Sequence, residues 1–167
     1  GEDFQMIACK GAEEAAQIVK ELYVKELAVH GMDQVQILSP YKVRSAAGVI
    51  EINRTIQDVV NPPISGKKEL HIHDHIFREG DKVLQNKNTI TIHKSQGNEC
   101  QVVIIPWVWA FYKMLKRNIL YTGITRAKQK VYLVGEKKAI TVAIKQESTG
   151  TRNTILAERI RYYCDIY

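Results

Sequence analysis

The feature that most restricts the fold is the apolar run Val102 to Ile105, which Gln101 precedes and Pro106 ends. The run consists of four consecutive β-branched apolar residues, and it is far too short to cross a membrane. It also lacks the polar alternation of a strand with one face in water. Such a run is typical of a strand in a parallel sheet that helices cover on both faces. The chain has 167 residues, 45% of them hydrophobic, which is enough to bury a sizeable core in one domain spanning residues 1–167.

Helical and extended patterns alternate around this run. We expect strands at residues 4–9, 35–38, 89–92, 101–105 and 130–134. We expect helices at residues 11–31, from about 45 to 61, through 114–124, from 137 and from 153. The alternating segment His71 to Phe77, the Glu79-Gly80 turn and the extended Lys82 to Gln85 predict a hairpin. This order indicates an α/β layered domain.

Charge and cysteine content narrow the class of partner. The formal net charge is +6 and the pI is about 9.2, which favours an anionic partner, with nucleic acid as the first candidate. Cys9, Cys100 and Cys164 are widely spaced and form no C-x-x-C pair, so neither a zinc ribbon nor a redox pair is indicated. Scattered thiols and the acidic first residues predict a cytosolic protein without a signal peptide or membrane span.

The first polar motif, Thr91 to Glu99, follows a β-branched strand and precedes the apolar one. Ligands of open α/β sheets sit in loops at strand ends. Gly97 permits a close approach of backbone to a ligand. The side chains that can donate to phosphate are those of Thr91, His93, Lys94 and Ser95. The alternative is a solvated connection with a glycine turn.

The second polar motif, Leu120 to Lys128, places Arg126 between a predicted helix and the strand at residues 130–134. A guanidinium in this position can reach over a sheet edge toward phosphate. In the alternative interpretation, Arg126 and Lys128 complement the dipole at the helix C-terminus.

Together the two motifs resemble the C-terminal motor domain of superfamily 1 DNA helicases, and within it the RecD-like group, the exodeoxyribonuclease V alpha-subunit family. T-x-H-K-x-Q-G-x-E is similar to helicase motif V, and Y-T-G-I-T-R-A-K is similar to motif VI. Further similarities lie at Gln36 to Pro40 with Gly48 and Asn53 (motif IV), at Phe77 to Gln85, at Met114 to Asn118 and at Leu156 to Arg159. The resemblance therefore extends over nearly the whole chain.

The resemblance implies a RecA-like lobe of the P-loop NTPase type, with a mostly parallel sheet flanked by helices. It also implies a small hairpin where the family has a barrel insertion, which the sequence lacks at the expected Asn88–Thr89 junction. The implied function is the C-terminal motor lobe of an ATP-dependent, 5′-to-3′ DNA helicase in bacterial recombination and repair. ATP and Mg²⁺ would be held mainly by an N-terminal RecA-like lobe. Single-stranded DNA, that lobe and other recombination subunits would be the partners, in the bacterial cytoplasm.

The resemblance also implies roles for individual residues. Arg126 would be the arginine finger, which stabilises charge on the transferring phosphate. Residues near the nucleotide would be Arg44, Gln96, Gly97 and Glu99. Residues facing the DNA backbone would be Thr91, His93, Lys94 and Ser95. Tyr121 and Thr125 would pack against Arg126 and orient it.

Two departures from a complete motor matter for function. The sequence has no G-x-x-x-x-G-K-[ST], since Ser65-Gly66-Lys67-Lys68 lacks both the upstream glycine and the following hydroxyl. The apolar run leads to Pro106-Trp107, where a motor's first lobe would need Asp-Glu for Mg²⁺. We therefore expect no ATPase activity from this chain alone. The alternatives are a stand-alone nucleic-acid-binding or partner-docking module derived from a helicase lobe, and a lobe of a conjugative relaxase helicase.

Three weaker signals favour structural interpretations. His71, His73 and His75 would share one face of a strand and could bind Zn²⁺, but without a fourth ligand nearby a solvated face is favoured, and no metal site is expected. Trp107, Trp109, Phe111 and Tyr112 could stack on bases, but a packed loop after the buried strand is favoured. Arg152, Arg159 and Arg161 indicate a solvated helix face.

Overall fold

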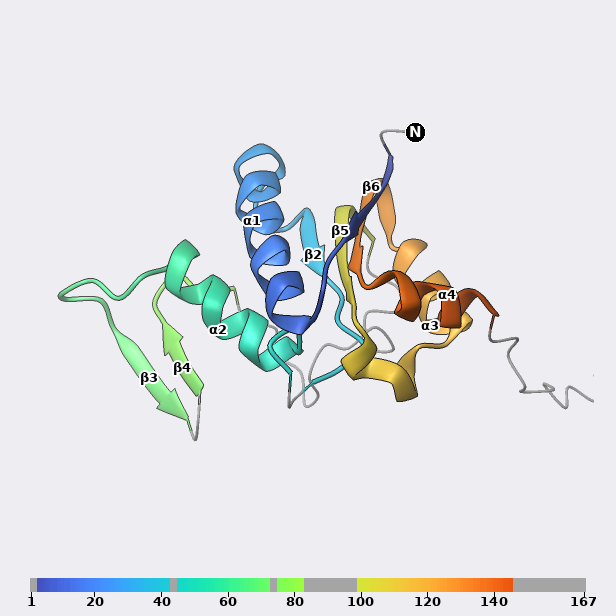
Figure 1. Cartoon of the computed structure of the whole chain (residues 1–167). Helices are drawn as coiled ribbons and strands as arrows, with labels where there is room; N and C mark the ends of the chain where they lie inside the picture. Colours follow the sequence, from blue (N-terminus) through green and yellow to red (C-terminus); the bar gives the residue numbers. More distant parts are fainter. Residues whose placement is uncertain (1–2, 43–44, 73–74, 83–98, 146–167) are drawn as a thin grey trace, which may run out of the picture.

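The fold is built around one parallel sheet of four strands, in the order β1-β6-β5-β2 (Figure 1). The computed structural model describes residues 3–42, 45–72, 75–82 and 99–145. The strands of the sheet are β1 (Phe4–Ala8), β2 (Val35–Ile37), β5 (Cys100–Trp107) and β6 (Ala127–Gly135). The helices are α1 (Ala12–His30), α2 (Val49–Val60), the 3₁₀ helix η1 (Trp109–Met114), α3 (Arg117–Ile124) and α4 (Lys137–Lys145). The predicted α/β class is confirmed.

β5 is an inner strand of this sheet, as its apolar sequence predicts. It pairs in parallel with β2 on one side and with β6 on the other. All four residues from Val102 to Ile105 are 0% exposed. Both faces of β5 are therefore covered from Val102 onward, and the one polar residue of the strand, Gln101, lies near its start and is partly exposed.

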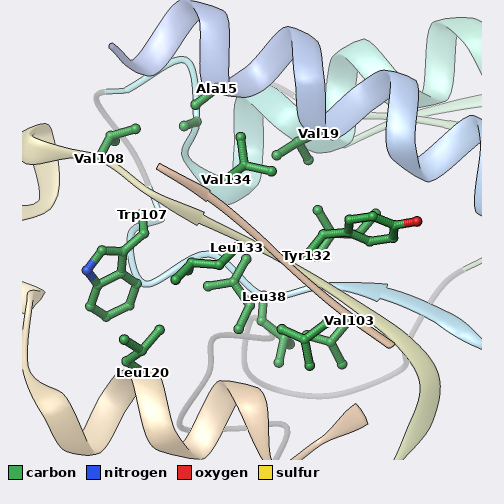
Figure 2. Close-up of a cluster of buried hydrophobic side chains, with 14 of the residues drawn as sticks. Ala15, Val19, Leu38, Val103, Trp107, Val108, Leu120, Tyr132, Leu133 and Val134 are labelled. Atoms are coloured by element: carbon green, nitrogen blue, oxygen red, sulfur yellow. The ribbon is translucent and has the colours of Figure 1, made fainter. Parts of the chain in front are cut away.

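Helices cover both faces of the sheet (Figure 2). Ala15 and Val19 of α1 lie against one face, and Leu120 of α3 lies against the other, beside Trp107. Spacings of three and four residues place such side chains on one side of each helix. No helix in the described ranges is long and apolar enough to span a membrane.

A buried carboxylate ties α1 to the sheet. Glu26 of α1 is 3% exposed and accepts a hydrogen bond of 2.5 Å from the Tyr132 hydroxyl of β6. His30 Nε2 lies 3.3 Å and Lys130 Nζ 3.6 Å from its oxygens. A buried charge needs such partners, because an unpaired one is strongly destabilising.

The hairpin differs from its prediction. His71 to Phe77 is not one strand: β3 (Glu69–Ile72) and β4 (His75–Arg78) pair antiparallel, beside α2 in Figure 1. His71 lies opposite Ile76 and His75 lies opposite Ile72, so these two histidines are on opposite faces. Alternation with period two fits one long strand and two short ones equally well, which is why the sequence misplaced the turn.

The Glu79-Gly80 turn does form, after β4, with Gly80 at a φ of 91°. Asp81 closes this turn by accepting from the backbone N–H of Arg78, and it also accepts from the side chains of Gln57 and Asn61 on α2. Burial raises the pKa of the Asp81 carboxyl, but these hydrogen bonds outweigh it and leave the pKa below its usual value. The turn therefore attaches the hairpin to α2.

Two helix boundaries also move. The helix expected from about Ser45 begins at Val49, because Ser45 to Gly48 forms a turn in which the Gly48 N–H donates to the Ser45 carbonyl. Met114 belongs to η1, which the sequence did not predict. The expected strand at 89–92, the extended residues 83–85 and the helix from Asn153 lie outside the described residues.

A substitution at Gly135 tests the β5–β6 contact. A Cβ built there would lie 2.3 Å from the carbonyl oxygen of Trp107, so the two strands would have to separate. We expect Gly135→Ala to lower the free energy of unfolding in urea by about 1–3 kcal/mol. Gly11→Ala is the matched control, since its Cβ would meet only Glu13 at 3.7 Å. Equal stability of the two variants would contradict the prediction.

A second substitution tests the Glu26 network. Burial first, and then the hydrogen bond to Glu26, raise the pKa of the Tyr132 phenol above its ordinary value of 10.0. The unfolded chain then loses this proton first, so the free energy of unfolding should fall as the pH rises above about 10.

We expect Tyr132→Phe to cost about 1–3 kcal/mol at neutral pH, because Glu26 loses a donor. The same variant should show a shallower loss of stability above pH 10.0, the ordinary tyrosine value. Urea unfolding from pH 7 to about pH 11 measures both effects, with the exposed Tyr121→Phe as control. A slope identical to that of the parent chain would show that Tyr132 is not responsible.

Candidate functional site

The two polar motifs meet where β5 and β6 begin. The Cys100 N–H donates to the Arg126 carbonyl at 3.0 Å, and Cys100 is in register with Ala127. The end of the first motif therefore lies beside the end of the second. We call this place, defined by Glu99, Cys100, Arg126 and Lys128, the amino edge of the sheet.

Arg126 is held at the amino edge by its backbone. It follows the last turn of α3, where its N–H donates to the Gly123 carbonyl at 3.2 Å, and it directly precedes β6. Its Nε is buried and has no hydrogen-bond partner among the described residues. Within the described part of the chain its guanidinium forms neither an ion pair nor a hydrogen bond to the carbonyls of α3, so the helix-capping alternative has no contact to support it there.

Glu99 forms an ion pair across the same edge. Its carboxylate lies 3.2 Å from Lys128 Nζ, and the two side chains are 58% and 53% exposed. An exposed pair of this kind contributes at most about 1 kcal/mol. Lys128 is thus occupied by Glu99 rather than by the end of α3, and Glu99 can exchange this partner for another donor at little cost.

The two residues predicted to support Arg126 lie differently. The Thr125 hydroxyl donates to the Thr122 carbonyl at 3.1 Å, which fixes it on the last turn of α3. The Tyr121 side chain is 68% exposed. The described residues therefore do not show Tyr121 packing against Arg126, and its role stays a prediction.

The segment resembling motif IV lies at the other end of the sheet. Leu38 follows β2 and donates through its N–H to the Ile104 carbonyl, near the end of β5. The buried Ser39 hydroxyl donates to the Ala47 carbonyl at 2.8 Å and so closes the loop that leads to α2. Arg44 lies outside the described residues, within this loop. The described ends of the loop are at the carboxyl edge of the sheet, opposite Arg126.

The remaining predicted site residues also lie outside the described residues. They are Thr91, His93, Lys94, Ser95, Gln96 and Gly97. Their predicted contacts with nucleotide and DNA stay predictions.

No metal centre is found among the described residues, which contain no group of three His, Cys, Asp or Glu able to hold a metal ion. The Gly66-Lys67 pair serves a local purpose, since the Lys67 ammonium donates to the Asn61 side chain and the Pro62 carbonyl. Cys9 and Cys100 are free thiols. Burial raises the pKa of both, so neither is an activated nucleophile.

One polar residue was missed by the sequence interpretation. Glu136 follows β6 directly and is buried. Its carboxylate accepts from the backbone N–H of Trp109 and lies 3.2 Å from Lys138 Nζ. An acidic residue between a buried strand and a helix is the only signal that could have identified it.

Comparison with known proteins gives matches of helicase type. Residues 89–134 match the UvrD-like helicase C-terminal domain, and this range includes both polar motifs. The chain is 26% identical to the ATP-dependent RecD2 DNA helicase of Deinococcus radiodurans, over 90% of this chain and 26% of the relative. It is 39% identical to the RecBCD enzyme subunit RecD of Mycobacterium tuberculosis, over 40% of this chain and 11% of the relative. It is 33% identical to the same subunit of Mycolicibacterium smegmatis, over 47% of this chain and 14% of the relative.

These matches, with the parallel sheet and its two helical layers, confirm the resemblance to the C-terminal region of RecD-like superfamily 1 helicases. The chain spans about a quarter of the Deinococcus relative and less of the others. The Deinococcus match extends over 196 residues, more than the 167 of this chain, so that relative has additional residues within the matched region.

Proposed function

We propose that this chain is the C-terminal motor lobe of an ATP-dependent DNA helicase and that Arg126 is its arginine finger. In this role the chain supplies one wall of a nucleotide cleft and part of a track for single-stranded DNA. The alternative is a nucleic-acid-binding or partner-docking module without ATPase activity.

The state of Arg126 is the observation that carries this proposal. Backbone hydrogen bonds on both sides fix the residue, while no group in the described part of the chain accepts from its buried Nε. An unsatisfied buried donor costs about 1–3 kcal/mol, which a phosphate oxygen would recover. A charge held at the cleft before the reaction needs no reorganisation when charge develops on the phosphate.

The described residues fit only part of a nucleotide site. Arg126 suits the terminal phosphate, because a guanidinium offers a fixed, planar set of donors. Glu99, paired with the exposed Lys128, could instead accept a hydrogen bond from the ribose. ATP with Mg²⁺ supplies the phosphoryl group whose hydrolysis drives the motor, and the proposal assigns both to residues of an N-terminal lobe.

The remaining parts of the proposal rest on the resemblance of the sequence motifs to those of the helicase family. We propose 5′-to-3′ movement on single-stranded DNA, work in recombination or repair in the bacterial cytoplasm, and association with an N-terminal lobe and with other recombination subunits. Thr91, His93, Lys94 and Ser95 would contact the DNA backbone. Arg44, Gln96 and Gly97 would complete the nucleotide site.

Removing the finger tests the central role in the full-length enzyme that contains this chain. We expect Arg126→Ala to lower the rate of ATP hydrolysis by roughly 10³-fold or more while nucleotide binding persists. Arg126→Lys should restore little of the lost hydrolysis rate, because a lysine ammonium does not reproduce the planar set of donors of a guanidinium.

Arg54→Ala is the matched control, since Arg54 is an exposed arginine on α2 that pairs only with Glu51 among the described residues. Steady-state hydrolysis and binding of a fluorescent ATP analogue are measured on the same preparations. Turnover of Arg126→Ala within a few-fold of the Arg54→Ala value would refute the finger role.

The isolated chain gives a second test. We expect the purified 167-residue chain to show no steady-state ATP hydrolysis with or without single-stranded DNA, because it lacks a G-x-x-x-x-G-K-[ST] loop. Phosphate release above that of a buffer control, sustained over many turnovers, would disprove this expectation.

A further inference from the structure

Two aromatic side chains are exposed just beyond the carboxyl end of β5. Trp109 and Tyr112 of η1 are 41% and 56% exposed, whereas Trp107 and Phe111 beside them in sequence are 0% exposed. A 3₁₀ helix brings residues three apart to the same side, which separates the exposed pair from the buried side chains. The two exposed rings are nearly parallel, at 28°, with their centroids 6.5 Å apart. The sequence interpretation, which favoured packing for all four aromatic residues, is therefore correct for Trp107 and Phe111 and wrong for Trp109 and Tyr112.

A lysine accompanies each exposed ring. Lys138 Nζ lies 5.5 Å from the centre of the Trp109 ring, and Lys113 Nζ lies 5.9 Å from the centre of the Tyr112 ring. Such contacts are cation–π interactions, and at exposed sites they are weak enough to be exchanged. We call Trp109, Tyr112, Lys113 and Lys138 the aromatic patch.

The part of the sequence that carries the aromatic patch is strongly basic, although Arg126, Lys128 and Lys130 lie toward the amino edge of the sheet and not beside the patch. Residues 100–145 contain nine Lys or Arg and a single acidic residue, Glu136. The basic residues are Lys113, Lys116, Arg117, Arg126, Lys128, Lys130, Lys137, Lys138 and Lys145. The positive surplus of the whole chain, +6, therefore comes from this part. A polyanion is the complementary partner.

Glu136 positions the aromatic patch. One carboxylate oxygen accepts from the Trp109 N–H at 2.5 Å, and the other lies 3.2 Å from Lys138 Nζ. The Glu136 carbonyl accepts from the N–H groups of Ala139 and Ile140 in the first turn of α4. The backbone of Trp109 and the ammonium of Lys138 thus contact the same buried carboxylate, before any ligand binds.

We propose that the aromatic patch binds single-stranded nucleic acid by stacking an unpaired base on Trp109, with Tyr112 beside it as the second ring of the patch. Lys113 and Lys138 then contact the phosphates on either side of that base. A nucleotide presents a flat π-face and a phosphate together, which matches an exposed ring with a cation beside it. Stacking of this kind is indifferent to base sequence, as a track along a strand requires.

This site is distinct from the nucleotide site proposed above. The aromatic patch follows the last residues of β5, whereas Arg126 lies beside its first residue. The aromatic patch needs neither ATP nor Arg126. A negative result for the aromatic patch therefore leaves the finger role of Arg126 intact, and a negative result for Arg126 leaves the aromatic patch intact.

The two tryptophans of the chain provide the readout, because only Trp109 is exposed. We expect a single-stranded oligothymidylate, without nucleotide or Mg²⁺, to quench the fluorescence of the 167-residue chain and to protect it from iodide. Trp109→Ala should weaken binding, measured by anisotropy of a labelled oligothymidylate, by roughly 5- to 100-fold. Trp109→Phe should retain most of the affinity, since it keeps a stacking face.

The lysines are tested by salt dependence. We expect Lys138→Ala and Lys113→Ala each to lower the slope of log affinity against log salt by about one or less. Lys25→Ala, an exposed lysine of α1, is the matched control and should leave the slope unchanged. Circular dichroism of each variant identifies any loss of folding, and the Lys138→Ala result remains informative if Trp109→Ala does not fold.

Three outcomes would overturn the proposal. They are unchanged affinity of Trp109→Ala, binding without any change in tryptophan fluorescence, and equal salt slopes for Lys138→Ala and Lys25→Ala. If Trp109→Ala instead binds the oligonucleotide normally but associates less with an N-terminal helicase lobe, the aromatic patch is a protein interface and the stacking site is wrong.

Discussion

The parallel pairing of β5 with β6 is the interaction on which the rest of the structure depends. The pair buries the most apolar of the described strands, and its two ends position both proposed sites. At one end the Cys100 N–H reaches the Arg126 carbonyl, and at the other the Glu136 N–H reaches the Trp107 carbonyl. The approach at that second end is so close that only a residue without Cβ fits at Gly135. The same pair of strands therefore stabilises the sheet and positions both proposed sites.

Much of this fold could be predicted because its signals are local. An apolar run indicates a strand covered on both faces, and spacings of three and four indicate the helices that cover it. Predictions failed where two structures share one pattern. The alternation from His71 to Phe77 fits one strand or a tight hairpin. The aromatic residues after Trp107 fit a packed loop or a 3₁₀ helix with one solvent-exposed side. In both cases tertiary contacts determine which of the two structures forms.

The candidate site was predictable to a similar degree. The position of Arg126 between a helix and a strand follows from sequence, and so does its chemistry. The absence of a hydrogen-bond acceptor for its Nε among the described residues does not follow from sequence, because it depends on tertiary contacts. Lys128 is paired with Glu99 at the start of the two strands, close to the point where the register of β5 on β6 shifts between Cys100 and Val102. No sequence pattern predicts this ion pair, which leaves Lys128 with a partner and Arg126 without an ion pair among the described residues.

The two functional regions lie at opposite ends of one strand. β5 has 8 residues and a strand rises about 3.3 Å per residue, so Arg126 and Trp109 are separated by roughly 25 Å along it. The strands between them are close-packed on both faces, and such a core does not bend by small amounts. If a phosphate engages Arg126 while a base is stacked on Trp109, the lobe must respond as one body. Movement of the nucleic acid would then arise from rotation of the whole lobe against its partner, with β5 and β6 as the rigid link between the two ligands.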